Sequence, residues 1–96
     1  MEESTFRAVR LCQALGSHTR FRILLLLAKR RMTPGELRRE LKKSGSVIST
    51  HLEKLRGADL VRFKREKEGL FYWLKPRGLP GLLRRIQDFA RSEHEA

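Results

Sequence analysis

The sequence has little of what stabilises secreted or membrane proteins. Its 96 residues include one cysteine, Cys12, which cannot form a disulfide within the chain and so agrees with a reducing compartment. The longest apolar run, Ile23 to Ala28, is far shorter than the ~20 residues that cross a bilayer. The first residues, MEES, lack the basic and then apolar order of a secretory signal. These absences lead us to expect a cytoplasmic protein.

The marks of an enzyme are also missing. The sequence has no glycine-rich phosphate loop, no nucleophile with its base and no carboxylate pair in a plausible cleft. The chain is 40% hydrophobic and 34% charged, which is typical of a folded globular protein. Its length fits one domain over residues 1–96. We therefore expect a single binding domain that is not an enzyme and holds no cofactor.

Acidic residues are scarce. Eleven Asp and Glu stand against 22 Lys and Arg, for a net charge of +11. Residues 18–75 carry sixteen basic and six acidic side chains, so their net charge is +10. A domain this basic is expected to associate with a polyanion, most often nucleic acid. A basic surface that serves solubility, or adaptation to heat or high salt, is the alternative from composition alone.

Helical periodicity predicts four helices in the first part of the chain, over about residues 5–15, 17–29, 33–43 and 44–57. The first helix is apolar on more than one side. The third helix opens with a capping box, Thr33-Pro34-Gly35-Glu36. In this motif the threonine hydroxyl and the glutamate carboxylate each accept a hydrogen bond from the other residue's backbone amide.

After Gly57 the period changes from helical to alternating. Residues 60–65 and 70–74 are rich in aromatic and branched side chains and are separated by Lys67-Glu68-Gly69, which predicts a β-hairpin. A last amphipathic helix follows over about residues 79–92. The sequence thus predicts a mainly α fold with a small hairpin.

The third and fourth helices form a candidate helix-turn-helix, because a short turn joins a basic helix to one rich in small hydroxyl residues. A rotation of about 100° per residue directs three aliphatic side chains into the core, namely Ile48, Leu52 and Leu55. The opposite face and its margins then carry Ser46, Thr50, Ser49 and Lys54. Short polar side chains can approach base edges and phosphates in the major groove. An ordinary polar surface is the alternative.

Basic residues flank this helix pair. On the third helix and the turn they are Arg38, Arg39 and Lys43, and near the hairpin tip they are Lys64, Arg65 and Lys67. A basic two-stranded wing can grip a neighbouring backbone or minor groove. The alternative is a hairpin that only seals the core with its aromatics, Phe63, Phe71, Tyr72 and Trp73.

Several blocks, in order, resemble the arsenic-repressor (ArsR-type) family of bacterial and archaeal regulators. They are ALGSHTRFRIL at residues 14–24, Glu36-Leu37, SGSVISTHLEKL at residues 44–55, ADLV at residues 58–61, Arg65-Glu66 and Tyr72. The resemblance covers roughly residues 5–75. The wing differs from the family pattern, since Gly69 lies about two positions later than expected.

The resemblance implies a winged helix-turn-helix homodimer that represses transcription by occupying operator DNA. It carries DNA contact onto Ser44, Ser46, Ser49, Thr50, His51 and Arg65. For His51, at the margin of the apolar stripe, a boundary position and a phosphate contact both remain open. The implied dimer pairs through the first and last helices, at Phe6, Val9, Leu79, Leu82, Leu83, Ile86 and Phe89.

Many members of that family sense a metal, but this sequence lacks the ligands that their sites require. No cysteine occurs at residues 30–36, where thiolate sensors have a pair, and Pro76 to Leu83 offers neither His nor carboxylate. We therefore predict no metal site. Cys12 is expected to be an inert buried thiol, with a redox sensor as the alternative, and His18 a structural or capping residue.

A winged helix that binds a protein partner or RNA is the rival interpretation, because a fold does not fix a function. The charge of residues 18–75 favours duplex DNA over a protein. RNA binders usually expose aromatics for stacking, whereas the aromatics here are expected in the hairpin core.

Overall fold

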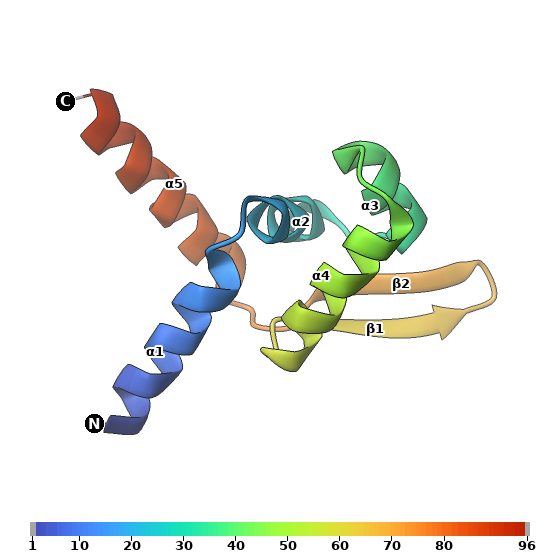
Figure 1. Cartoon of the computed structure of the whole chain (residues 1–96), viewed down its shortest axis with the longest axis horizontal. Coiled ribbons are helices and arrows are strands. Elements are labelled where there is room, and N and C mark those ends of the chain that lie inside the picture. Colours follow the sequence, from blue (N-terminus) through green and yellow to red (C-terminus); the bar gives the residue numbers. More distant parts are fainter. Residues whose placement is uncertain (1, 96) are drawn as a thin grey trace.

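The structure, a computed structural model, describes residues 2–95 and contains five helices and one antiparallel hairpin (Figure 1). In chain order the elements are α1 (Glu2–Leu15), α2 (His18–Lys29), α3 (Pro34–Leu41), α4 (Gly45–Gly57), β1 (Val61–Glu66), β2 (Gly69–Leu74) and α5 (Leu79–Glu95). The predicted fold class and element order are confirmed. The terminal helices are longer than predicted. α1 begins with Glu2 and Glu3, whose charges suit a helix N-terminus.

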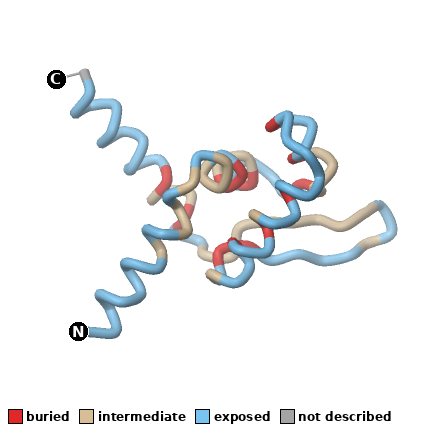
Figure 2. Tube along the Cα trace, viewed as in Figure 1, coloured by how far each residue is buried: buried red, intermediate tan, exposed pale blue. Residues whose placement is uncertain are grey.

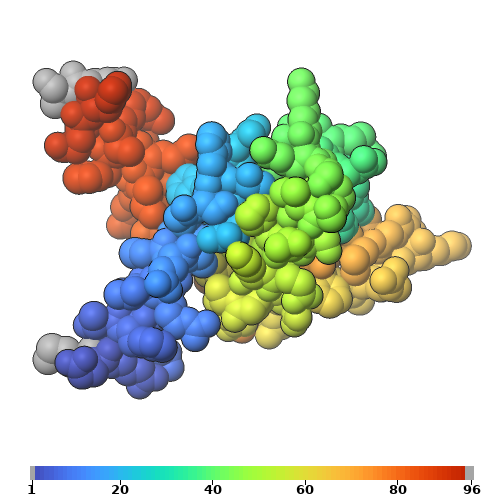
Figure 3. Space-filling model, viewed as in Figure 1, coloured from blue at the N-terminus to red at the C-terminus, as the bar shows by residue number. Residues whose placement is uncertain are grey.

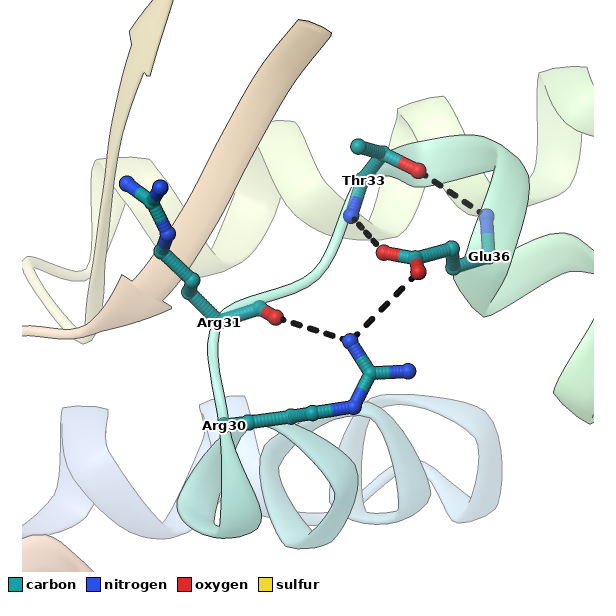
Figure 4. A network of polar contacts seen from close by, with 4 residues as sticks. All are labelled: Arg30, Arg31, Thr33 and Glu36. Atoms are coloured by element: carbon teal, nitrogen blue, oxygen red, sulfur yellow. Dashed lines mark hydrogen bonds and ion pairs between the residues drawn. The ribbon is translucent and has the colours of Figure 1, made fainter. Parts of the chain in front are cut away.

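Side-chain caps begin the three central helices. Ser17 accepts a hydrogen bond from the amide of Arg20 at 3.2 Å, and Ser44 accepts one from the amide of Val47 at 3.2 Å. At α3 the predicted capping box is complete (Figure 4): Thr33 Oγ1 accepts from the Glu36 amide at 3.1 Å, and the Thr33 amide donates to Glu36 Oε1 at 2.9 Å. These local bonds explain why the boundaries at residues 17, 33 and 44 could be read from the sequence.

The core lies where α2, α3 and α4 meet the start of the hairpin and the start of α5 (Figure 2). Its buried side chains are Ile23, Leu24, Leu27, Met32, Leu37, Leu41, Ile48, Leu52, Leu55, Leu60, Val61, Leu79 and Leu83. Two of them correct the sequence analysis. Leu79 and Leu83 are 4% and 1% exposed in the chain's own core, so they are not available to a dimer partner.

The rest of α5 and most of α1 project from this core on the side away from the hairpin (Figures 2 and 3). α1 has no buried residue. The exposed large apolar side chains of the two helices are Phe6, Val9, Ile86 and Phe89. Cys12, predicted to be a buried thiol, is exposed here, because the helix that carries it is covered on only part of its surface.

The hairpin is fixed to the body at its base and along β2. Val61 pairs with Leu74 and Glu66 with Gly69, which leaves Lys67 and Glu68 as the turn. Gly69 has a φ of +149°, a conformation that side-chain-bearing residues rarely adopt. Met32 and Tyr72 exchange two backbone hydrogen bonds, at 3.1 and 2.8 Å, so the segment before α3 joins the sheet. Among residues 2–95, no helix is long and apolar enough to cross a membrane.

Candidate nucleic-acid interface

A three-residue turn joins α3 to α4. α3 ends at Leu41, and Lys42 then adopts the left-handed conformation, with φ 54° and ψ 47°. The amides of Lys42 and Lys43 both donate to the carbonyl of Arg38, which closes the end of α3. Ser44 caps the N-terminus of α4. The axes of α3 and α4 lie at an angle to each other (Figure 1). The predicted helix-turn-helix geometry is present.

The two faces of α4 separate as the rotation predicts. Ile48, Leu52 and Leu55 are 0, 2 and 0% exposed in the core. The opposite face is exposed and carries Ser46, Ser49, Thr50 and Lys54. Ser44 is also exposed, but its hydroxyl oxygen already accepts the Val47 amide and lies 3.3 Å from the Ser46 hydroxyl. The first turn of α4 therefore presents two adjacent hydroxyls to solvent.

Thirteen of the 22 Lys and Arg residues fall into two sets that bear on nucleic-acid binding. Six are in ion pairs, namely Arg7, Arg30, Arg31, Arg56, Lys75 and Arg91. The seven predicted to face DNA are Arg38, Arg39, Lys43, Lys54, Lys64, Arg65 and Lys67, and within residues 2–95 none of these forms an ion pair. All seven are exposed. Their charge is thus not neutralised by the chain's own acids and is available to a polyanion.

The wing, which is the hairpin of β1 and β2, carries three of these basic residues. Lys64 and Arg65 lie on β1 and Lys67 in the turn, so only Lys67 is at the tip itself. The expectation that the hairpin aromatics belong to the core is wrong for Phe63, which is 46% exposed and rests beside Tyr72 with ring centroids 5.2 Å apart. Phe71, Tyr72 and Trp73 are half-buried.

Arg31 fastens the wing to the loop before α3. Its two terminal nitrogens donate to the two carboxylate oxygens of Glu66 at 2.9 and 3.0 Å, and its guanidinium lies 4.2 Å from the centre of the Phe71 ring. The bond to Arg31 lowers the pKa of Glu66. This contact neutralises an acid next to Arg65, so the basic character of the wing is kept.

His51 lies at the boundary between the core and the exposed face of α4. It is half-buried, and its Nδ1 is 3.4 Å from a terminal nitrogen of Arg20 in α2. Burial lowers the pKa of His51, and the positive charges of Arg20, Lys54 and Lys43 lower it further. The structure therefore gives His51 a partner within the chain, while its predicted DNA contact stays a prediction.

Sequence reasoning missed Arg20 and Arg31. Their partners are 31 and 35 residues further along the chain, and no local pattern marks such pairs. The exposed Val47, on the first turns of α4, was also missed.

The potential metal ligands are dispersed. Cys12, His18 and His94 lie on α1, the start of α2 and the end of α5. Among the described residues, no three His, Cys, Asp or Glu side chains come together as a metal site would require.

The comparison with known proteins decides the family. Residues 17–62, which span the helix-turn-helix, match the model of the "Bacterial regulatory protein, arsR family". The transcriptional activator HlyU of Vibrio cholerae is 36% identical over 74 residues, which are 77% of this chain and 68% of HlyU. The chain belongs to the arsR family. The HTH-type transcriptional regulator KmtR of Mycobacterium tuberculosis is a second relative of this arsR-family chain, 39% identical over 67 residues, or 70% of this chain and 52% of KmtR.

Solved structures agree with this membership. HlyU from Vibrio cholerae superposes on this arsR-family chain with a TM-score of 0.85 at 30% identity, covering 93% of this chain and 97% of HlyU. The homodimeric winged helix-turn-helix domain of Mb0332 from Mycobacterium bovis has a TM-score of 0.88 at 22% identity, covering 98% and 87%, and supports the fold. The protein is therefore a transcriptional regulator with a DNA-binding winged helix, and not an enzyme.

Proposed function

We propose that this arsR-family chain is a homodimer that binds a specific duplex operator and represses the promoter it covers. One observation carries the proposal: seven exposed basic residues on α3, the turn, α4 and the wing form no ion pair within residues 2–95, and α4 exposes a face of small hydroxyl residues. Lys and Arg side chains without an internal ion pair supply the attraction to the DNA phosphates. Small hydroxyl side chains allow α4 to approach the edges of the nucleobases closely. Such a protein acts in the cytoplasm, where bacterial DNA lies.

The exposed apolar side chains support the dimer. Phe6 and Val9 on α1 are 61% and 50% exposed, and Phe89 on α5 is 69% exposed. Apolar patches of this kind on a small domain mark association sites, and two-fold pairing is the commonest solution. The projecting parts of α1 and α5, the helices that carry these side chains, lie on the side opposite the wing (Figure 3), so a partner bound there leaves the wing of both chains free for DNA.

Repression follows from occupancy. A dimer seated across a promoter excludes the polymerase without any further contact. The relative HlyU is named an activator, so the direction of regulation needs a direct test. The test is a reporter whose promoter overlaps an operator selected by the protein from a random pool of duplexes. A fall in expression when the protein is present supports repression, and a rise overturns it.

Binding to duplex DNA should weaken steeply with salt. If each subunit neutralises about four phosphates, the dimer should show a slope of log K against log salt of roughly −7. Titration of a labelled duplex at four or five salt concentrations measures this slope. A slope near zero would favour the rival role, a winged helix that binds a protein. A preference for single-stranded RNA over duplex DNA of the same sequence would favour the RNA-binding alternative.

Metals should leave the affinity for DNA nearly unchanged. The separated Cys12, His18 and His94 do not offer a ligand set on one centre, and four well-placed ligands make a closed zinc site. The measurement is operator affinity with and without added zinc, cadmium or arsenite. A weakening of about tenfold or more, or about 1.4 kcal/mol in binding free energy, would contradict this and direct attention to those three residues.

A further inference from the structure

Arg20 connects the end of α1 to the DNA-facing helix α4. Its Nε donates to the carbonyl of Ala14 at 2.8 Å and one terminal nitrogen donates to the carbonyl of Gln13 at 3.0 Å. Its other terminal nitrogen faces Nδ1 of His51 at 3.4 Å. Each of the three nitrogens of the half-buried Arg20 guanidinium thus has a partner on α1 or α4, while Arg20 itself belongs to α2.

The two carbonyls lie in the last turn of α1, where carbonyl groups lack partners within the helix. The Gln13 carbonyl also accepts a hydrogen bond from the amide of Gly16, just beyond the helix, at 3.3 Å. Within residues 2–95, Arg20 provides the only side-chain hydrogen bonds that tie α1 to the rest of the chain. The remaining attachment is apolar contact of Leu11, Ala14 and Leu15 with the core. The polar side-chain contribution to the direction of α1 therefore comes from Arg20.

We propose that Arg20 is a positioning residue that sets the angle between the dimerisation helix α1 and the recognition helix α4, and thereby the half-site spacing that the dimer accepts. This inference rests on the proposed dimer and its use of α1. Two recognition helices fit successive major grooves only if their separation matches about one helical turn of DNA, roughly 34 Å. Because α1 lies in the interface, a change in its angle to α4 moves the two recognition helices relative to each other.

The His51 end of this contact depends on protonation. A guanidinium has donors only, so Nδ1 of His51 must accept, and the ring is then neutral with its proton on Nε2. Burial and the facing charges of Arg20 from α2, Lys43 from the turn and Lys54 from α4 lower the pKa of His51 below its usual value of 6.5. The contact between His51 and Arg20 is therefore intact at neutral pH. When the pH falls below 6.5 and passes the lowered pKa of His51, the ring gains a proton. Protonated Nδ1 can no longer accept a hydrogen bond, and the charged ring repels Arg20.

The test measures spacing preference. Duplexes bound by the wild-type dimer are first selected from a random pool, and the two half-sites are then moved apart or together by about one to three base pairs. We expect wild type to prefer one spacing by about tenfold and Arg20→Met to reduce this preference below about threefold, with the dimer mass and the salt slope unchanged. Arg22→Met is the matched control, since Arg22 is exposed on the same helix and makes no side-chain hydrogen bond among the described residues.

Two His51 variants keep the test independent of how well Arg20→Met folds. His51→Leu removes the acceptor but leaves both bonds from Arg20 to α1, and should also broaden the spacing preference. His51→Gln keeps an acceptor that does not titrate. Between about pH 8 and about pH 5 the wild-type preference should decline, whereas that of His51→Gln should not change with pH.

Two results would overturn the proposal. If Arg20→Met weakens binding at every spacing equally, Arg20 supports the fold in general. If it lowers the salt slope by about one unit, Arg20 contacts a phosphate directly. A wild-type chain that is monomeric or does not bind duplex DNA would instead contradict the proposed function, which is a separate and earlier outcome of the same experiment.

Discussion

Replacing Phe6 and Phe89 with glutamate should yield a folded monomer that has lost most of its affinity for a two-half-site duplex. The two side chains are 61% and 69% exposed, so neither supports the core, and a carboxylate on each would oppose burial between two chains. Two linked binding units gain about 10²- to 10⁴-fold over one unit, and a monomer forfeits that gain. Light scattering at micromolar concentration measures the mass, and titration of the selected duplex measures the affinity.

Two controls separate association from charge and from folding. Phe89→Leu keeps an apolar side chain and should remain a dimer. Gln87→Glu adds the same charge to the exposed part of α5, but Gln87 points about 160° away from Phe89 around the helix. It should dimerise normally. If the double glutamate variant keeps the wild-type mass, the interface lies elsewhere.

Loss of the Thr50 hydroxyl should weaken binding to the preferred duplex and leave binding to random duplex almost unchanged. Thr50 is exposed on α4 opposite buried Ile48, so Thr50→Ala should not disturb folding. A side chain that reads a base edge contributes about 1–3 kcal/mol of discrimination, which is roughly 5- to 150-fold in affinity. Thr50→Ser keeps a hydroxyl and should retain most of the preference. The same comparison applies to Ser46→Ala.

Arg65 on the wing should respond differently. If it contacts the backbone, Arg65→Ala should weaken specific and random duplexes alike and reduce the salt slope by about one unit. Arg56→Ala is the matched control, because Arg56 is exposed but already paired with Glu53 at 2.9 Å, and its loss should change the slope less. An interface that only packs predicts no change for Thr50 or Arg65, and affinities at two salt concentrations decide the matter.

The fold could be predicted because its signals are local. Ser17, Thr33 and Ser44 each cap a helix through an amide three residues later, which is within the reach of a sequence pattern. The exposed face of α4 followed in the same way from the spacing of its buried aliphatic residues. These features locate the helix-turn-helix without any knowledge of its neighbours.

The errors arise where the answer depends on which surface covers an apolar stripe. Leu79, Leu83, Ile86 and Phe89 form one continuous pattern in the sequence, yet the first two lie in the chain's own core and the last two are exposed. Helical periodicity in the sequence predicts that one face of a helix is apolar, but it does not predict which surface packs against that face. The contacts of Arg20 with His51 and of Arg31 with Glu66 join distant segments and so leave no local trace either.

The division of α5 gives this helix the properties of a lever. Leu79 and Leu83 hold its first turns in the core, while the helix continues for 17 residues in all, a length of about 25 Å. With Leu79 as the pivot, a tilt of about 5° displaces the far end of the helix by about 2 Å and displaces Leu83, one turn from the pivot, by only about 0.5 Å. A small rearrangement in the core would therefore produce a larger displacement at the far end of α5. In the opposite direction, a molecule that pushes on the far end would exert a larger force on the core around Leu83.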